Sequence, residues 1–426
     1  MRLQTISDKG CVLMQFFSIY DLLLSKAAEK NVSVEDMISF FHSRKIKKGQ
    51  LCELQQTAYI PNDPTFQEAV KDFLGMSVLE INLAMGYIPK EYRKSYFRNI
   101  SFIASQLEKE NVIENKILYH PYFENNYGRL YNEDCIKIMR QMPDCSINLV
   151  FADPPFNLGK TYDPGIDDNM TISMYINWIY DWLDECIRIL KPGGRIFIYN
   201  LPKWCIYIVA YLKQFLTFGN WIAIDMKFTL PIQNRLYPAH YALVSFIKGV
   251  KATTFNNQRI PLQTCRHCGG EIKDYGGYKG KMNPRGVNVS DVWSDIYPVR
   301  HKKSKNRKYN ELSVKLLDRI ISMATNEGDI IFDPFGGSGT TFIVAQMLNR
   351  KWIGCELGDC EIIKQRLLNP SRDKERLKKI KEETDCLFTK KSELLRKKNG
   401  FWVCDDCNRK FTRNPDEQLS IDFSAK

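Results

Sequence analysis

The chain has 426 residues, of which 44% are hydrophobic and 26% charged, proportions typical of a globular and not of a disordered protein. The 61 Lys and Arg residues against 49 Asp and Glu give a net charge of +12, which favours a polyanionic partner. The longest apolar stretch near the start, residues 11–24, is interrupted by Gln15 and Asp21, so the sequence predicts neither a membrane span nor a signal peptide. Thirteen cysteines, an odd number, do not suggest a disulfide framework, and we expect a reducing intracellular compartment.

Residues 1–118 are expected to form a helical accessory domain. Apolar residues recur every three or four positions in residues 34–41, 66–73 and 101–107, which is the period of an amphipathic helix. The region carries no chemical motif. Dimerisation and contact with the polyanionic partner are the alternatives to a purely accessory role.

From residue 119 onward, short apolar strands alternate with amphipathic helices. The strands are expected at residues 147–152, 195–199, 225–229, 241–247, 329–332 and 352–355. The helices are expected at residues 175–190, 312–323 and 340–349. This alternation predicts an α/β fold with a doubly wound, mainly parallel, Rossmann-like sheet.

The positive charge is concentrated between the two parts of this sheet. Residues 248–310 contain 14 Lys and Arg against 4 Asp and Glu, and they are rich in Gly and Asn. The densest run is Arg300, Lys302, Lys303, Lys305, Arg307 and Lys308. A solvated surface is one interpretation, but the interleaved Tyr275, Tyr278, Trp293 and Tyr297 favour loops that bind nucleic acid.

A glycine-rich turn follows one of the expected strands, in the sequence Phe332-Asp-Pro-Phe-Gly-Gly-Ser-Gly-Thr-Thr341. Its glycines permit a tight turn and close approach of a ligand, and the helix after it directs unpaired amides at the same place. The sequence lacks the Gly-Lys-Ser/Thr of a nucleoside-triphosphate loop. Glu356, after the next strand, is placed like the acid that binds ribose hydroxyls in nucleoside-binding folds.

A second motif, Asp153-Pro154-Pro155-Phe156, follows the strand at 147–152. Two prolines make a stiff loop whose carbonyls point outward. A carboxylate and a carbonyl together accept both hydrogens of an amino group, and an aromatic ring stacks on a flat one. The motif therefore suits a planar substrate with an exocyclic –NH2, although a rigid turn with an incidental Asp is the alternative.

Together, the two motifs resemble those of the bacterial amino-methyltransferases of DNA, over roughly residues 118–369. These enzymes transfer a methyl group from S-adenosylmethionine to the exocyclic nitrogen of adenine or cytosine. The catalytic motif comes first and a basic segment separates it from the cofactor motif, as in the beta class. The resemblance implies a catalytic half at residues 119–248, a target-recognition insertion at 249–310, and a cofactor-binding half at 311–369.

The resemblance also implies roles for individual residues. The catalytic group is Asp153, Pro154, Pro155 and Phe156. The cofactor pocket is lined by Asp333, Pro334, Phe335, Gly337, Ser338, Gly339, Thr340 and Glu356, with Asp134 of the segment Asn132-Glu133-Asp134-Cys135, where the family usually has Gly in place of Glu133. The DNA-binding group is Arg300, Lys302, Lys303, Lys305, Arg307 and Lys308.

The implied substrate is double-stranded DNA, from which the target base is flipped out. An Asp at the first motif position is typical of N6-adenine enzymes in this family, so we expect N6-methyladenine, with N4-cytosine as the alternative. The resemblance further implies a restriction–modification system with a cognate restriction endonuclease, and a monomer or homodimer in the cytoplasm, associated with the nucleoid. Two competing interpretations are an RNA or protein amide methyltransferase, whose cofactor loop usually comes first, and a DNA-binding module without catalysis.

Two Cys-x-x-Cys pairs are present, Cys265 with Cys268 in the basic segment and Cys404 with Cys407 in a charged C-terminal extension, residues 370–426. Four thiolates complete a tetrahedral structural Zn²⁺ site, provided that the C-terminal extension folds back onto the basic segment. Four unrelated free thiols are the alternative. A redox dithiol is disfavoured because neither pair lies between a strand and a helix.

Overall fold

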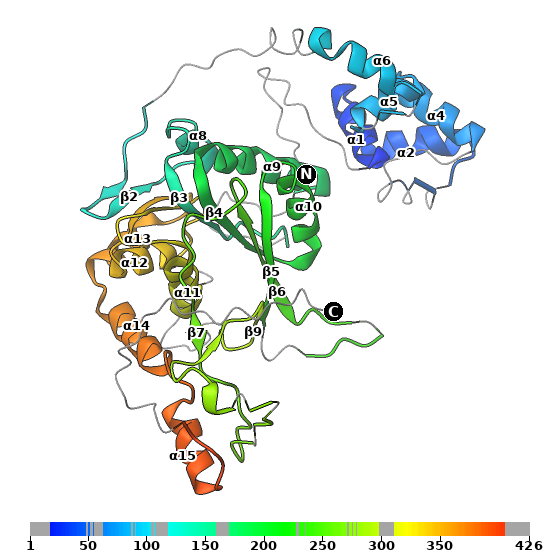
Figure 1. Ribbon diagram of the computed structural model, residues 1–426. Coiled ribbons are helices and arrows are strands. Elements are labelled where there is room, and N and C mark those ends of the chain that lie inside the picture. Colours follow the sequence, from blue (N-terminus) through cyan, green and yellow to red (C-terminus); the bar gives the residue numbers. More distant parts are fainter. Residues whose placement is uncertain are drawn as a thin grey trace.

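The computed structural model describes residues 18–47, 50–51, 54, 63–86, 88–89, 91–103, 106, 118–158, 170–226, 230–234, 236–270, 272–274, 276–277, 279–297 and 311–404. These residues form a cluster of N-terminal helices and an α/β core (Figure 1). Within these ranges, no helix is both long and apolar enough to cross a membrane.

The N-terminal helices are short and end where the sequence supplies caps. They are α1 (Ile19–Glu29), α2 (Val34–Ser43), α4 (Pro64–Leu74), α5 (Val78–Ala84) and α6 (Arg93–Arg98). Ser33 and Asp63 accept hydrogen bonds from the backbone amides that open α2 and α4. Phe41 and Phe73 pack together with a ring-centroid distance of 5.5 Å in a core separate from that of the sheet. The helices expected at 34–41 and 66–73 are confirmed, whereas the one at 101–107 lies partly outside the described residues.

The core is a nine-stranded sheet with the order β1-β2-β11-β10-β3-β4-β6-β5-β9. Its strands are β1 (Phe123–Glu124), β2 (Gly128–Tyr131), β3 (Ile147–Ala152), β4 (Leu190–Asn200), β5 (Thr217–Asp225), β6 (His240–Ile247), β9 (Val292–Trp293), β10 (Ile330–Asp333) and β11 (Lys351–Cys355). Pairing is parallel along β2-β11-β10-β3-β4 and between β5 and β9, and antiparallel at β1-β2, β4-β6 and β5-β6. The expected mainly parallel sheet is therefore confirmed.

Helices cover both faces of the sheet, which explains why most residues of its central strands are apolar. Leu149 and Phe151 of β3 point into one hydrophobic cluster, with residues of α11 (Val314–Ala324), α12 (Thr340–Met347), α13 (Cys360–Leu368) and α14 (Ser371–Glu383). Val150 and Ala152 point into the other cluster, with residues of α8 (Cys135–Met139), α9 (Ile172–Ile189) and α10 (Pro202–Leu212). The sheet is doubly wound, as expected.

The chain runs outward in opposite directions from the pair β3 and β10. β3 leads through α9 to its neighbour β4, whereas β10 leads through α12 to β11 on the other side. β3 and β10 are themselves parallel neighbours, with Ile331 beside Leu149 and Phe332 beside Val150. The topological switch point, where open α/β sheets bind ligands, thus lies between the two strands that carry the motifs.

One strand expectation was wrong. Residues 225–229 were expected to form a strand, but β5 runs from Thr217 to Asp225, and residues 227–229 lie outside the described part. β5 is fixed by its antiparallel register with β6, in which Trp221 faces Val244 and Ile224 faces Tyr241. The position of β5 is therefore set by its pairing with the next strand along the chain, and local apolar content does not reveal that register.

The described residues between 249 and 291 leave the core as loops with little regular structure, as their composition predicted, and β9 then rejoins the sheet. The described part contains the two-residue strands β7 (Arg259–Ile260) and β8 (Val287–Asn288) and a short 3-10 helix, Lys279–Lys281. Arg319 of α11 forms two hydrogen bonds with Asp295, of 2.9 and 2.6 Å, and so attaches the end of this segment to the core. Burial opposes ionisation of Asp295, but Arg319 and Lys315 bring its pKa down to about 2.

Candidate active site

The carboxyl ends of four neighbouring parallel strands meet at one edge of the sheet, and each is followed by an acidic residue. In spatial order these are Asp134 after β2, Glu356 after β11, Asp333 at the end of β10 and Asp153 after β3. Because parallel strands end at the same edge, the sequence-predicted catalytic and cofactor residues lie together there. The two loops therefore open on the same side of the molecule.

The Asp153-Pro154-Pro155-Phe156 loop is held in place by two aromatic side chains from the helices beside it. The hydroxyl of Tyr175, on α9, donates a hydrogen bond to the Pro155 carbonyl. The indole Nε1–H of Trp204, on α10, donates to the Phe156 carbonyl at 2.7 Å. These two contacts hold the loop through its carbonyl groups. Pro154 and Pro155 have no amide hydrogen with which to form backbone hydrogen bonds of their own.

The Phe156 ring lies against two tyrosines from the adjoining strands. Its centroid is 6.3 Å from that of Tyr199 on β4 and 6.0 Å from that of Tyr241 on β6. Both tilts are intermediate, 43° and 44°, and Phe156 is only half-buried. An aromatic surface therefore adjoins Asp153, as a stacked planar substrate requires.

Two of the carboxyl groups at this edge are held in an environment that disfavours their charge. Burial, and then the charge of Asp333, raise the pKa of Asp153 well above its ordinary value. Burial raises the pKa of Asp333 to about 7, and Glu356 adds to the shift while Thr341 and the Phe335 amide oppose it. Among the described residues, no lysine or arginine forms an ion pair with Asp153 or Asp333. A positively charged ligand bound beside these two carboxyl groups would favour their charged forms.

The glycine turn between β10 and α12 is shaped by Asp333. One carboxylate oxygen accepts from the Phe335 amide at 2.9 Å, and the other accepts from the Thr341 hydroxyl at 2.5 Å. The backbone then passes through positive φ at Gly337 (53°) and Gly339 (76°) before α12 begins. Asp333 is therefore buried beneath the turn and holds it through these two hydrogen bonds. Pro334, the next residue, is also buried.

Glu356 connects the glycine turn to the neighbouring strands. One carboxylate oxygen accepts from the Gly337 amide at 2.5 Å and the other from the Gly358 amide at 2.7 Å. Asn132, after β2, donates to the Glu356 carbonyl at 2.8 Å. Asp134 caps α8 by accepting from the amides of that helix, so its carboxylate is oriented at the same edge. The carboxylates and the turn fit the ribose hydroxyls and the cationic sulfur of S-adenosylmethionine.

Aromatic residues of the helix expected at residues 175–190 also join the two loops. Trp178 and Trp182 of α9 contact the Phe335 ring at centroid distances of 5.5 and 5.2 Å. Trp178 also stacks on Tyr175, which holds the proline loop. Helical periodicity predicts the helix, but it does not show that these side chains pack against the loops of the site.

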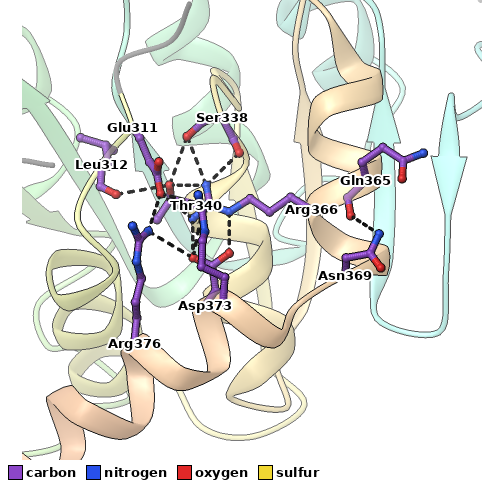
Figure 2. A network of polar contacts seen from close by, with 10 residues as sticks. Glu311, Leu312, Ser338, Thr340, Gln365, Arg366, Asn369, Asp373 and Arg376 are labelled. Carbon is purple, nitrogen blue, oxygen red and sulfur yellow. Dashed lines mark hydrogen bonds and ion pairs between the residues drawn. The ribbon is translucent and has the colours of Figure 1, made fainter. Parts of the chain in front are cut away.

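Sequence reasoning also missed Arg366. This residue of α13 donates to the Ser338 carbonyl at 2.9 Å and to the Thr340 hydroxyl at 3.0 Å (Figure 2). It lies beyond the recognised motif, and no feature of residues 360–368 indicates its partner. By contrast, Ser338 and Thr340 were expected in the cofactor pocket, and both are buried in the turn.

The two Cys-x-x-Cys pairs are described only in part. Cys265 and Cys268 are exposed, Cys404 is half-buried, and Cys407 lies outside the described residues. α15 (Lys390–Lys398) packs on the first pair: Arg396 donates to the carbonyls of Gly269 and Gly270, and Asn399 donates to the Cys268 carbonyl at 3.1 Å. Across the described ranges, no three Cys, His, Asp or Glu side chains gather as ligands of one metal ion.

The expected DNA-binding group lies wholly outside the described residues. It consists of Arg300, Lys302, Lys303, Lys305, Arg307 and Lys308.

Comparison with known proteins identifies the class to which this fold and site belong. The family model for DNA methylases of the N6/N4 type matches residues 147–365, from the first residue of β3 into α13. The match covers more than half of the chain, so the protein belongs to the N6/N4 DNA methylase family, whose enzymes depend on S-adenosylmethionine. The resemblance of the two motifs is therefore confirmed.

Individual relatives extend this result beyond the core. The type II methyltransferase M.BamHI of Bacillus amyloliquefaciens is 54% identical over 398 residues, which is 92% of this chain and 94% of that protein. The DNA adenine methyltransferase YhdJ of Escherichia coli is 29% identical over 282 residues, 64% of this chain and 94% of that protein. Among solved structures, PvuII DNA methyltransferase, described as cytosine-N4-specific, aligns over 62% of this chain and 95% of its own with 20% identity and a TM-score of 0.43.

Proposed function

We propose that the protein is a site-specific DNA methyltransferase that modifies the exocyclic amino group of a base flipped out of the duplex. The observation that carries the proposal is the parallel pairing of β3 with β10, because it places Asp153 beside the glycine turn of a DNA methylase. When bound, S-adenosylmethionine supplies a methyl group that is electrophilic because its sulfur is positively charged.

The residues at this edge then act mainly by positioning. The lone pair of an aromatic amine delocalises into the ring, so the amino nitrogen is a weak nucleophile. Hydrogen bonds from its two hydrogens to the Asp153 carboxylate and the Pro154 carbonyl favour a tetrahedral nitrogen and stabilise the positive charge that develops on it. As the nitrogen takes the methyl group, the S–C bond breaks to leave a neutral thioether, and the nitrogen then releases one of its two protons. Phe156, between Tyr199 and Tyr241, holds the ring of the base. No cysteine nucleophile takes part in this chemistry.

The base is the finer part of the proposal. Both adenine and cytosine present an exocyclic amino group to Asp153, so the hydrogen-bonding geometry does not choose between them. The Asp at the first motif position, typical of N6-adenine enzymes, keeps N6-methyladenine as our prediction, with N4-methylcytosine as the alternative. Mass spectrometry of nucleosides from methylated DNA distinguishes the two, whereas 5-methylcytosine as the product would contradict amino methylation altogether.

The relatives described above support a proposal for the DNA partner and the biological setting. The chain extends over nearly all of a type II methyltransferase, M.BamHI, and we propose that it likewise belongs to a restriction–modification system with a cognate nuclease, in the bacterial cytoplasm. Residues 249–310 are proposed to contact phosphates and base edges, because their basic side chains are the groups that bind the DNA backbone. Long-read modification sequencing of DNA from cells that express the gene would report base and target sequence together.

The role of Asp153 is tested by substitution. We expect Asp153→Ala and Asp153→Asn to lower methyl transfer from labelled S-adenosylmethionine to DNA at least about 100-fold, because the transition state loses its carboxylate acceptor. DNA affinity, measured by gel shift, should remain close to that of the wild type. Asp144→Asn is the matched control, since that side chain is 74% exposed and pairs with Arg188 before β3 begins. Unchanged turnover in the Asp153 variants would remove the assigned role.

We also propose that Cys265, Cys268, Cys404 and Cys407 hold one structural Zn²⁺. The support is the Cys-x-x-Cys spacing of both pairs, together with the packing of α15 and the residues after it on the first pair. Arg396 is fully buried there, and it donates at 2.8 Å both to the Gly269 carbonyl and, from Nε, to the Trp402 carbonyl, two residues before Cys404. Residues 390–402 of the C-terminal extension therefore fold back onto the segment that carries the first pair. In the described structure Cys265, Cys268 and Cys404 are not gathered around one point, so a shared site requires the second pair to move closer to the first.

Metal analysis of the purified chain tests the zinc proposal. We expect one zinc per chain in the wild type and its loss in both Cys268→Ser and Cys404→Ser. Cys145→Ser, which removes an exposed cysteine outside the pairs, should keep the metal. Less than one zinc per wild-type chain, or zinc retained in both paired-cysteine variants, would refute a shared site.

A further inference from the structure

A buried network of charged side chains lies behind the glycine turn (Figure 2). Its members come from three segments: Glu311 just before α11, Arg366 on α13, and Asp373 and Arg376 on α14. The side chains of Glu311, Arg366 and Asp373 are only 2%, 8% and 1% exposed. Ion pairs at this depth are screened little by solvent, so removing one partner has a large effect.

The side chain of Arg366 contacts the turn directly. Its Nη1 donates to the Ser338 carbonyl at 2.9 Å, to the Ser338 hydroxyl at 3.3 Å and to the Thr340 hydroxyl at 3.0 Å. These atoms lie on either side of Gly339, where the backbone has positive φ and α12 begins. Arg366 therefore holds the part of the turn that fixes the direction of the first amides of α12.

The rest of the guanidinium is fixed by acids. Nε and Nη2 form a bidentate pair with Asp373, at 2.9 Å each, and Nη2 also lies 3.2 Å from Glu311. Burial opposes ionisation of Asp373, but Arg366, Arg372 and Arg376 lower its pKa below the ordinary value, so it stays charged. A planar fork with this many fixed partners has one orientation, and lysine cannot reproduce it.

We propose that Arg366 is a positioning residue for S-adenosylmethionine: it does not touch the reacting atoms, but holds the Ser338–Thr340 part of the turn in the geometry that binds the cofactor. The inference rests on the proposed function, because it assigns the turn to that cofactor. Glu311 follows directly on the basic segment in sequence, so the same network also anchors the point where that segment rejoins the core.

Arg366→Lys is the main test variant, since it keeps the positive charge but loses the fork. We expect the Kd of S-adenosylmethionine, measured by isothermal titration calorimetry, to rise about tenfold. The KM for the cofactor should rise in parallel, while kcat at saturating cofactor and the KM for DNA should change less than about threefold, because the proline loop is untouched.

Arg350→Lys is the matched control for simple loss of stability. Arg350 is also a buried arginine of the cofactor half, but it binds the Thr325 carbonyl and hydroxyl, at 2.8 and 3.1 Å, near the opposite end of α12. Its substitution should lower the melting temperature and leave the cofactor Kd within about twofold of the wild type. If Arg366→Lys does not fold, Asp373→Asn replaces it, because Asp373 fixes the Arg366 guanidinium through two hydrogen bonds.

The outcomes separate this inference from the proposed function. If the wild-type protein binds no S-adenosylmethionine and methylates no DNA, the proposed function fails. If the wild type does both, but the folded test variant keeps its cofactor Kd within about twofold, Arg366 does not position the turn. An equal loss of cofactor affinity in Arg350→Lys would likewise overturn the inference, since it would reduce the effect to general destabilisation.

Discussion

Gly339→Ala tests whether the glycine turn is as tightly constrained as the structure indicates. Gly339 has φ 76°, and a Cβ added to it would lie 2.7 Å from Cγ2 of Ile363 on α13. The left-handed conformation costs a non-glycine residue about 1–2 kcal/mol, and overpacking a well-filled core costs about 1–3 kcal/mol more. We therefore expect the free energy of unfolding to fall by about 2–5 kcal/mol.

Gly337→Ala is the control from the same turn. Its φ is 53°, but the nearest atom to an added Cβ is the Phe335 carbonyl oxygen at 3.9 Å, which is ordinary contact. Gly337→Ala should therefore lower the free energy of unfolding only by the cost of the left-handed backbone conformation, about 1–2 kcal/mol. Urea unfolding followed by circular dichroism measures both variants, and calorimetry measures their affinity for S-adenosylmethionine.

A double-mutant cycle with Ile363→Ala isolates the clash. Truncation of Ile363 removes the atom that the new methyl group meets, so Gly339→Ala should cost less in that background than in the wild type, by about 1–3 kcal/mol. The reasoning is refuted if Gly339→Ala is no more destabilising than Gly337→Ala, or if the Ile363 background leaves its cost unchanged.

Two further predictions concern the loop and the acids of the site. Tyr175→Phe removes the hydroxyl that donates to the Pro155 carbonyl. In steady-state assays we expect kcat to fall about five- to tenfold, with an unchanged KM for S-adenosylmethionine. An unchanged kcat would show that this contact does not position the loop. Burial raises the pKa of Asp333 from 3.8 to about 7, so folding favours its protonated form, and the free energy of unfolding should fall as pH rises between these values, by about 1.4 kcal/mol per pH unit from this group. Asp333→Asn should remove that component in urea titrations across the range, and an identical pH dependence in the variant would contradict the shift.

The central strands could be predicted from sequence because they are buried on both faces. Residues 147–152 are apolar except for Asn148 and were placed correctly, whereas the position of β5 depends on its register with β6 and was not. Likewise, α10 was not predicted. Its sequence, residues 202–212, is apolar on most sides, so it offers little contrast between a buried and an exposed face.

The site was predictable at the level of its motifs, because strand ends on one edge of a parallel sheet must lie together. The contacts that fix it were not. Tyr175 reaches the Pro155 carbonyl across 20 positions of the chain, and Arg366 reaches the Ser338 carbonyl across 28. The hydrogen bonds by which both oxygens of Asp333 bind the turn itself were likewise not predicted. Such contacts depend on three-dimensional packing, about which local sequence patterns carry no information.

The basic segment also contributes the last strand of the sheet, β9. β9 comes from that segment, and its residue Val292 lies beside Ala223, so it covers the outer border of β5. A shortened enzyme without residues 249–297 would lose the pairing of β9 with Ala223 and Ile224, and the uncovered side of β5 would then favour strand-to-strand association between molecules. Chimaeras in which this segment is replaced by that of a relative should therefore retain Val292–Trp293, so that β9 still pairs with β5.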